Sequence, residues 1–462
     1  MVGFPMIVAA VVLALPLALF GQTSRPEPET KSFELTPTPP PVPALKYELL
    51  YDVLSDRVPG NAATLYMQTA MMMGVESPKV AADALEAYEA NDLEKFDKLA
   101  EKIDRPPIFK NLDVAARRDK CDWDPPIRQL GAYTFLPQLE PFAHGLTTMI
   151  MVHALAQMEH GKLDEAIETL RLGYEMSDKV GREPTLVSGL VALGINGHMN
   201  DVLTRLMNRP NAPNLYWALM QMPSGRGLYR NSLHVERRFL VPSVPNLYEA
   251  IKGAELTPQE WHAILDYMAE VQAIDSGEGG RKKVTDSVKA ATAENLKQAR
   301  EMYAKQCNLK AEQVEKIDPV VVLGNFYVRQ AEVVSDDIFK LRNLPYPELF
   351  KQASVVKQRQ DKLKRDTPGT PFLPMLDLGR TTARLAQADR QRAAMVNVEA
   401  IRSYAAANSG KLPSRLEDIT DTPAMENPWT GEPFEYAVKG DVATLADSRS
   451  TTPLTYTIRI RK

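Results

Sequence analysis

Apolar side chains recur every three to four positions from Ala44 to about Thr370, and this spacing limits the fold more than any other feature. It places apolar groups on one face of an α-helix, while Pro, Gly and Asn separate successive segments. Thr257 to Glu260 is typical of a helix start, because a hydroxyl can cap the helix, proline takes its first position and glutamate its third. We therefore predict a mainly α-helical body over residues 44–370.

One pair of predicted helices, over about residues 150–180, has the composition of an antiparallel hairpin. Ala154, Gly161 and Ala166 are small where two helices must touch, and Gly161 can adopt the left-handed conformation that ends the first helix. This segment resembles a tetratricopeptide unit. A similar pattern occurs seventy residues earlier, at 84–96, and seventy is about twice that family's repeat length. The body is therefore predicted as an irregular stack of tetratricopeptide-like hairpins, with an irregular helical bundle as the alternative.

The C-terminal module, residues 371–462, has a different pattern. A long helix is predicted from about 376 to 407. After it, apolar and polar residues alternate, as they do in a strand with one buried face, and Lys439-Gly440-Asp441 is typical of a hairpin turn. The module is therefore predicted as a helix packed on a three-stranded antiparallel sheet, with strands near 434–438, 442–446 and 454–460.

Several residues of this module form a recognisable set: Tyr404, Gly410, Leu412, Pro413, Leu416, Asn427, Pro428, Trp429, Gly431, Pro433, Phe434 and Tyr436. On these residues, the segment at about 390–446 resembles the globular end of G-type pseudopilins of type II secretion, which implies the helix-on-sheet fold. The assembly helix and the calcium-binding loop of that family have no counterpart here, so the resemblance implies the fold alone. The whole arrangement also resembles a group of exported bacterial helical proteins of unknown function, which share the Cys-Asp-Trp segment seen at 121–123.

The N-terminal segment is predicted to direct export. Residues 2–20 carry no charged side chain and contain an unbroken apolar run, so residues 1–21 are typical of a signal peptide or an uncleaved membrane anchor. Residues 22–43 are rich in proline and polar residues, which favours an extended Pro-rich linker. At about 3.1 Å per residue, this linker would hold the body up to roughly 60 Å from a membrane.

Composition excludes some classes of function. The 55 basic and 59 acidic side chains give a net charge of −4, which argues against nucleic-acid binding. The six histidines and two cysteines show no metal-ligand spacing, and no nucleophile or phosphate-loop motif is present, so no catalytic, cofactor or metal residue is predicted. In an oxidising compartment, Cys121 and Cys307 are a possible disulfide pair.

Two features are candidates for contact with a partner. Trp123 lies in a dense acidic loop, where its indole can bind a ligand or pack between helix layers. Lys357, Arg359, Lys362 and Arg365 belong to a basic run, which is a solvated helix face unless it meets an acidic partner or anionic lipid.

Together these patterns favour a non-enzymatic binding or scaffold protein of the cell envelope. It would be periplasmic, at the cell surface or tethered to the membrane by an uncleaved N-terminus, and it would bind a protein or peptide. Stacked hairpins create the concave surfaces that such proteins use. The alternative is a cell-wall or glycan-acting hydrolase with a site between the helical body and the C-terminal module.

Overall fold

The computed structural model describes residues 28–52, 55–124, 141–183, 185–225, 246–274, 295–341, 343–366 and 378–461. Over these residues the chain is mainly helical and has a small four-stranded sheet. The predicted signal peptide or anchor, residues 1–21, lies outside the described residues. None of the helices in the described ranges is long and apolar enough to cross a membrane.

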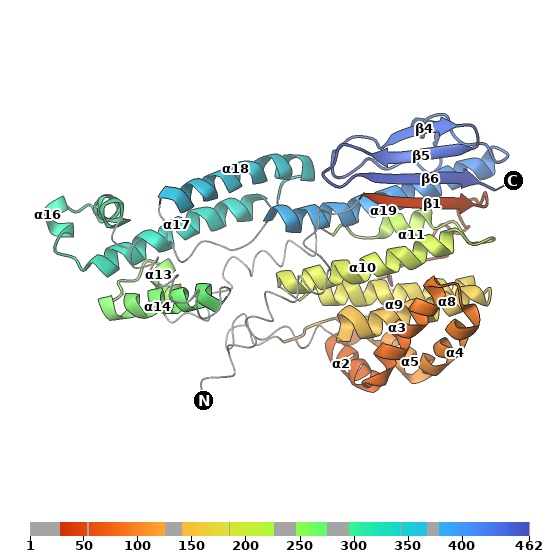
Figure 1. The fold of residues 1–462 in the computed structure, drawn as a ribbon, viewed down its shortest axis with the longest axis horizontal. Coiled ribbons are helices and arrows are strands. Elements are labelled where there is room, and N and C mark those ends of the chain that lie inside the picture. Colours follow the sequence, from red (N-terminus) through yellow and green to blue (C-terminus); the bar gives the residue numbers. More distant parts are fainter. Residues whose placement is uncertain are drawn as a thin grey trace. The chain divides into compact units, whose positions relative to one another are not determined.

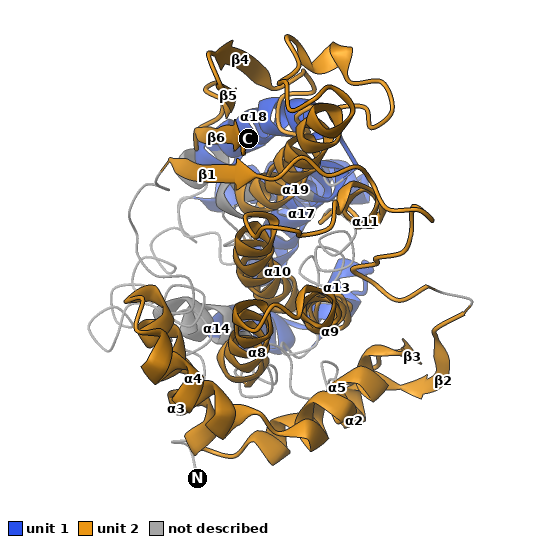
Figure 2. Cartoon of the chain, turned by 90° about the vertical axis from the view of Figure 1, so that its right-hand side faces the viewer, with its two compact units in different colours: residues 1–21, 125–137, 233–381 blue, residues 22–124, 138–232, 382–462 orange. Residues whose placement is uncertain are grey.

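Contacts between Cα atoms divide the chain into two units (Figure 2). Unit 1 comprises residues 1–21, 125–137 and 233–381, and unit 2 comprises residues 22–124, 138–232 and 382–462. Unit 2 therefore joins the first part of the predicted helical body to nearly all of the predicted C-terminal module. The sequence pattern had instead grouped residues 44–370 as one body, because local spacing carries no information about which segments meet.

The helical part of unit 2 consists mainly of antiparallel hairpins (Figure 1). Its helices are α2 (Ala62–Met73), α3 (Glu76–Glu89), α4 (Leu93–Ile103), α5 (Pro106–Ala116), α8 (Thr147–Glu159), α9 (Leu163–Gly181), α10 (Leu186–Met207) and α11 (Tyr216–Gln221). A π-helical turn, η2 (Pro141–Leu146), precedes α8. Two short strands, β2 (Val58–Asn61) and β3 (Arg118–Lys120), pair in parallel.

The predicted hairpin over residues 150–180 forms as α8 and α9. Ala154 and Ala166 are fully buried, and Gly161 has the positive φ of 72° that ends α8. The earlier segment with the same pattern forms a second hairpin, α3 and α4, in which Asn91 takes the left-handed position with φ of 58°. The two hairpins pack on each other through α3 and α8. The sequence therefore predicted both hairpins, because each depends on a local turn residue and on small contact residues.

The sheet of unit 2 contains one strand that was not predicted from the sequence. Its order is β1-β6-β5-β4, and β1 runs parallel to β6 whereas the other neighbours are antiparallel. The strands are β1 (Glu29–Leu35), β4 (Glu435–Lys439), β5 (Val442–Asp447) and β6 (Leu454–Ile460), and the long helix beside them is α19 (Leu378–Ala407). The predicted three-stranded antiparallel sheet is thus corrected to a four-stranded mixed sheet.

Strand β1 lies inside residues 22–43, which were predicted to be a Pro-rich linker. Its Phe33 and Leu35 are fully buried, and the Phe33 ring packs against Tyr456 with ring centroids 5.4 Å apart. The seven residues from Glu29 to Leu35 contain no proline, so each can donate its backbone N–H to a ladder. Proline on both sides obscured this short strand in the composition.

A buried guanidinium joins three distant segments of unit 2. Arg402, on α19, has no exposed surface and donates from Nε to the carbonyl oxygen of Thr36 at 2.8 Å. Its terminal nitrogens donate to the carbonyl oxygens of Ala212 and Pro213 at 2.5 and 3.2 Å. The equally buried Glu399 carboxylate lies 3.4 Å away. The chain after β1, the loop after α10 and α19 are therefore fixed to one another.

Unit 1 is a separate helical cluster. The predicted helix start at Thr257 is confirmed: the Glu260 carboxylate accepts the Thr257 N–H at 2.8 Å, and α14 begins at the next residue. Trp261 is fully buried against Gly324, where a Cβ atom would lie 2.1 Å from the indole. The named helices of unit 1 are α13 (Leu247–Ile251), α14 (Pro258–Ile274), α16 (Ala311–Val314), α17 (Pro319–Leu341) and α18 (Tyr346–Asp366), with residues 295–307 also helical.

Candidate functional site

Trp123 is partly buried and packs against the core of unit 2. Its ring stacks on Tyr66 and meets Phe142 edge-on, with centroids 6.2 and 5.2 Å away. The indole Nε1 donates to the carbonyl oxygen of Lys179 at 3.0 Å. Because its ring contacts Tyr66 and Phe142 and its N–H has a backbone acceptor, Trp123 joins residues 118–124 to α9, as expected for the packing role.

The two cysteines are free thiols and lie in different units. The structure therefore gives no support to the predicted Cys121–Cys307 disulfide. Cys121 is half-buried beside Lys179 and Arg182, and burial raises the pKa of its thiol to about 12. Since the thiolate is the reactive form, Cys121 is a poor nucleophile at neutral pH. Cys307 is exposed at the end of the helix over residues 295–307.

The basic run lies on α18 and is solvated where it is described. Lys357, Arg359 and Lys362 are exposed, and Arg359 forms an ion pair with Asp337 of α17. Arg365 belongs to the last turn of the same helix, but its side chain lies outside the described set. We call Lys357, Arg359, Lys362 and Arg365 the basic face of α18.

The structure brings together a different set of residues, which no motif had singled out. A buried ion pair joins the segment before α2 to the middle of α9. The Glu175 carboxylate accepts both terminal nitrogens of Arg57 at 2.7 and 2.8 Å, and also the backbone N–H of Tyr51 at 2.7 Å. Arg57 donates further to the carbonyl oxygen of Ala116 at 2.7 Å. Two opposite charges with filled hydrogen-bonding positions therefore fasten the chain at Tyr51 and Arg57 to α5 and α9.

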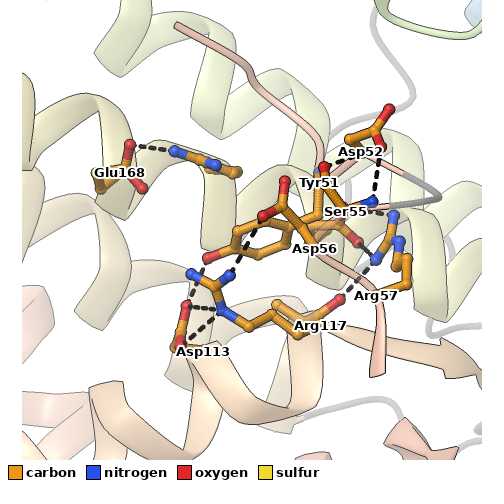
Figure 3. Close-up of polar contacts among 11 residues, drawn as sticks. Tyr51, Asp52, Ser55, Asp56, Arg57, Asp113, Arg117 and Glu168 are labelled. Carbon is orange, nitrogen blue, oxygen red and sulfur yellow. Dashed lines mark hydrogen bonds and ion pairs between the residues drawn. The ribbon is translucent and has the colours of Figure 1, made fainter. Parts of the chain in front are cut away.

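Next to this pair, the ring of Tyr51 lies between two guanidinium groups. Arg117 and Arg171 lie 4.2 and 4.7 Å from the ring centroid. The Tyr51 hydroxyl donates to Asp113, which also accepts from Arg117 Nε at 3.0 Å (Figure 3). Burial and the nearby Asp113 carboxylate raise the pKa of the Tyr51 phenol, so it remains a donor at neutral pH. We call Tyr51, Arg57, Asp113, Arg117, Arg171, Glu175 and Lys179 the Glu175 cluster.

Lys179 extends this cluster by one helical turn along α9. Its ammonium group is fully buried, donates to the carbonyl oxygen of Arg118 at 2.9 Å and lies 3.8 Å from Glu175. Burial, together with the positive charge of Arg182, lowers the pKa of Lys179. Burial also raises the pKa of Glu175, against the opposing effect of Arg57. Both shifts show that α9 holds charges in a poorly hydrated environment, which is frequent at functional sites and in structural ion-pair networks alike.

Glu183 follows in the same four-residue spacing, just beyond the end of α9. It is 2% exposed, and within the described part of the chain its Oε1 has no hydrogen-bond partner. Burial raises the pKa of its carboxyl to about 7, although a hydrogen bond from Ser188 acts in the opposite direction. Glu175, Lys179 and Glu183 follow one another at four-residue spacing, but α9 carries other charged residues, so this spacing alone did not mark the cluster in the sequence.

Glu183→Gln is expected to remove a pH dependence of stability. The folded-state pKa lies above the usual 4.5, so the native chain binds the extra proton and loses stability as pH rises from about 4.5 through 7. Above pH 7 the full loss, about 3 kcal/mol, should be absent in the variant, which cannot ionise. Urea unfolding of both proteins at pH 5 and pH 8 measures this. Equal pH dependence of the two free energies of unfolding would contradict the assignment.

The chemistry open to these groups is limited by their mutual pairing. Glu175 is held by Arg57, and Asp113 by Arg117 and Tyr51, so their charged atoms are occupied by protein groups. Over the described ranges, no three His, Cys, Asp or Glu side chains are arranged to hold a metal ion. The Glu175 cluster is therefore suited to fixing the chain at Tyr51, at Arg57 and over residues 118–124. Comparisons with protein-family models, curated proteins and solved structures find no match to this chain.

Proposed function

We propose that this chain is an exported or membrane-tethered, non-enzymatic binding or scaffold protein of the cell envelope. The observation that carries the proposal is the packing of hairpin α3–α4 on hairpin α8–α9, which extends to α10. Stacked helical hairpins of this kind present an extended surface to a protein or peptide. The Glu175 cluster supports the same proposal, because its charges stabilise the stack instead of remaining available to a substrate.

The proposed contact for an acidic partner is the basic face of α18. Lys357 and Lys362 are exposed there, and neither has an ion-pair partner among the described residues. Such unpaired surface charges increase the rate of association with an oppositely charged surface and lose their effect as salt screens them.

The direct test is capture from crosslinked cell envelopes with the full chain as bait. Recovery of one stoichiometric protein is the expected result. A second assay incubates the chain with purified cell wall. Release of soluble wall fragments would support the hydrolase alternative and contradict this proposal. A chain treated in the same way after thermal unfolding controls for adhesion through exposed apolar surface.

Reversing the charge of the basic face should weaken capture. Lys357→Glu with Lys362→Glu is expected to reduce the association rate for an acidic partner about tenfold at low salt, and less at higher salt. The matched control is Lys110→Glu with Lys411→Glu, two exposed residues of unit 2. Surface plasmon resonance at two salt concentrations measures the effect. An equal reduction in the control and the double variant would indicate a general charge effect and exclude α18 as the contact.

A further inference from the structure

The two edges of the sheet differ in how they are covered. At the β1 edge, the backbone N–H of Glu34 donates to Asn208 Oδ1 at 2.7 Å, and Lys31 reaches Asp201 of α10 at 3.1 Å. Strand β4 forms the opposite edge and pairs only with β5 among the described strands (Figure 1). Four of its five residues are exposed, including Val438 at 39%. An open strand edge is a template for pairing with another strand.

The turn after β4 determines which backbone groups face outward. Lys439 pairs with Val442 across the two-residue turn at Gly440, so this closing pair exchanges hydrogen bonds within the hairpin. Hydrogen-bonded and non-hydrogen-bonded pairs alternate along an antiparallel ladder. The N–H and C=O groups of Tyr436 and Val438 therefore point away from β5, towards the open edge.

We propose that the open edge of β4 pairs antiparallel with β4 of a second copy of this chain, about a two-fold axis at Ala437. In this register Tyr436 lies opposite Val438 of the second copy, so the outward groups of both strands meet and form hydrogen-bonded pairs. A two-fold axis makes the contact self-complementary, as in most homodimers.

The side chains of β4 favour the same register. Glu435 lies opposite Lys439 of the second copy, and each dimer contains this pair of opposite charges twice. The aromatic ring of Tyr436 meets the exposed β-branched side chain of Val438, which is another favourable cross-strand combination. Within one chain Glu435 accepts from Ser448 at 2.6 Å and lies 3.8 Å from Arg449, two residues that follow β5, so pairing with Lys439 of the second copy would compete with these contacts. A shift by two residues would lose both charge pairs.

A five-residue strand pair is a small interface, so the dimer is expected to be weak. Sedimentation velocity of the full chain in detergent, from micromolar concentration to about 1 mM, should show a monomer–dimer equilibrium. Val438→Pro removes an outward N–H without removing a bond to β5 and should abolish the dimer. A chain that remains monomeric throughout, or a dimer unaffected by this change, would overturn the proposal.

Charge reversal tests the register. Glu435→Lys or Lys439→Glu alone places like charges opposite each other and should weaken the dimer about tenfold, from two altered pairs. The double variant restores both pairs and should recover the original affinity, although it also lacks the Glu435–Ser448 bond. A mixture of the two single variants should form heterodimers. Glu432→Lys, at an exposed neighbouring residue, is the control. A double variant as weak as the singles would exclude this register.

Crosslinking tests the position of the axis. Ala437 would face itself across a non-hydrogen-bonded pair with Cα atoms about 4.5 Å apart, which suits a disulfide. With Cys121 and Cys307 replaced by serine, Ala437→Cys should form a covalent dimer on mild oxidation. Lys439→Cys, on the same face of β4, would face residue 435 and should remain monomeric. Equal crosslinking of the two variants, or a monomer that binds a strand of another protein instead, would contradict self-pairing.

Discussion

Arg402→Met is expected to lower the free energy of unfolding of unit 2 by about 3–5 kcal/mol, which is the range for removing one partner of a buried ion pair while the other stays buried. The change leaves the fully buried Glu399 without its guanidinium partner. It also removes the donors to the carbonyl oxygens of Thr36, Ala212 and Pro213. Urea unfolding followed by circular dichroism measures the loss.

Two comparison variants separate the causes of this loss. Arg402→Met combined with Glu399→Leu removes both charges and should recover part of the stability, because an apolar pair can replace a buried ion pair. Arg415→Met breaks a surface pair with Asp418 and should cost at most about 1 kcal/mol. A loss as small for Arg402→Met as for Arg415→Met would show that the buried guanidinium does not hold the three segments together.

Glu175→Leu is expected to destabilise unit 2 by a similar amount, about 3–5 kcal/mol, because Arg57 and Lys179 would remain buried without their common carboxylate. The N–H of Tyr51 would also lose its acceptor. Release of the segment should accompany the loss of stability, so hydrogen exchange at residues 46–61 should accelerate more than exchange within α8.

The control for this prediction lies nearly three turns earlier on the same helix. Glu165→Leu removes a carboxylate that pairs with Lys162, outside the Glu175 cluster, and is 56% exposed, so it should change stability by less than about 1 kcal/mol. It should also leave exchange at residues 46–61 unchanged. Faster exchange in both variants would indicate that α9 as a whole, and not the Glu175–Arg57 pair, fixes the segment.

Trp123 and Glu175 show how much of the site could be predicted from the sequence. Trp123 was recognised in the sequence because an aromatic residue in an acidic loop is conspicuous, yet its role depends on Tyr66, Phe142 and Lys179. Glu175 was not recognised, because a glutamate within a helix is usually a solvated residue. Only the approach of Arg57, 118 residues earlier, distinguishes it.

The sequence by itself determined the local structure: the helical segments, the capped start of α14, the turn residues of both hairpins and the alternation in β6. These features depend on contacts within a few residues, where backbone conformation and side-chain spacing decide the outcome. Only the tertiary structure decided that β1 completes the sheet, that the C-terminal module belongs with the first helices and that Arg402 meets Thr36, 366 residues away. Such pairings depend on which surfaces exclude water together, and local spacing does not encode that choice.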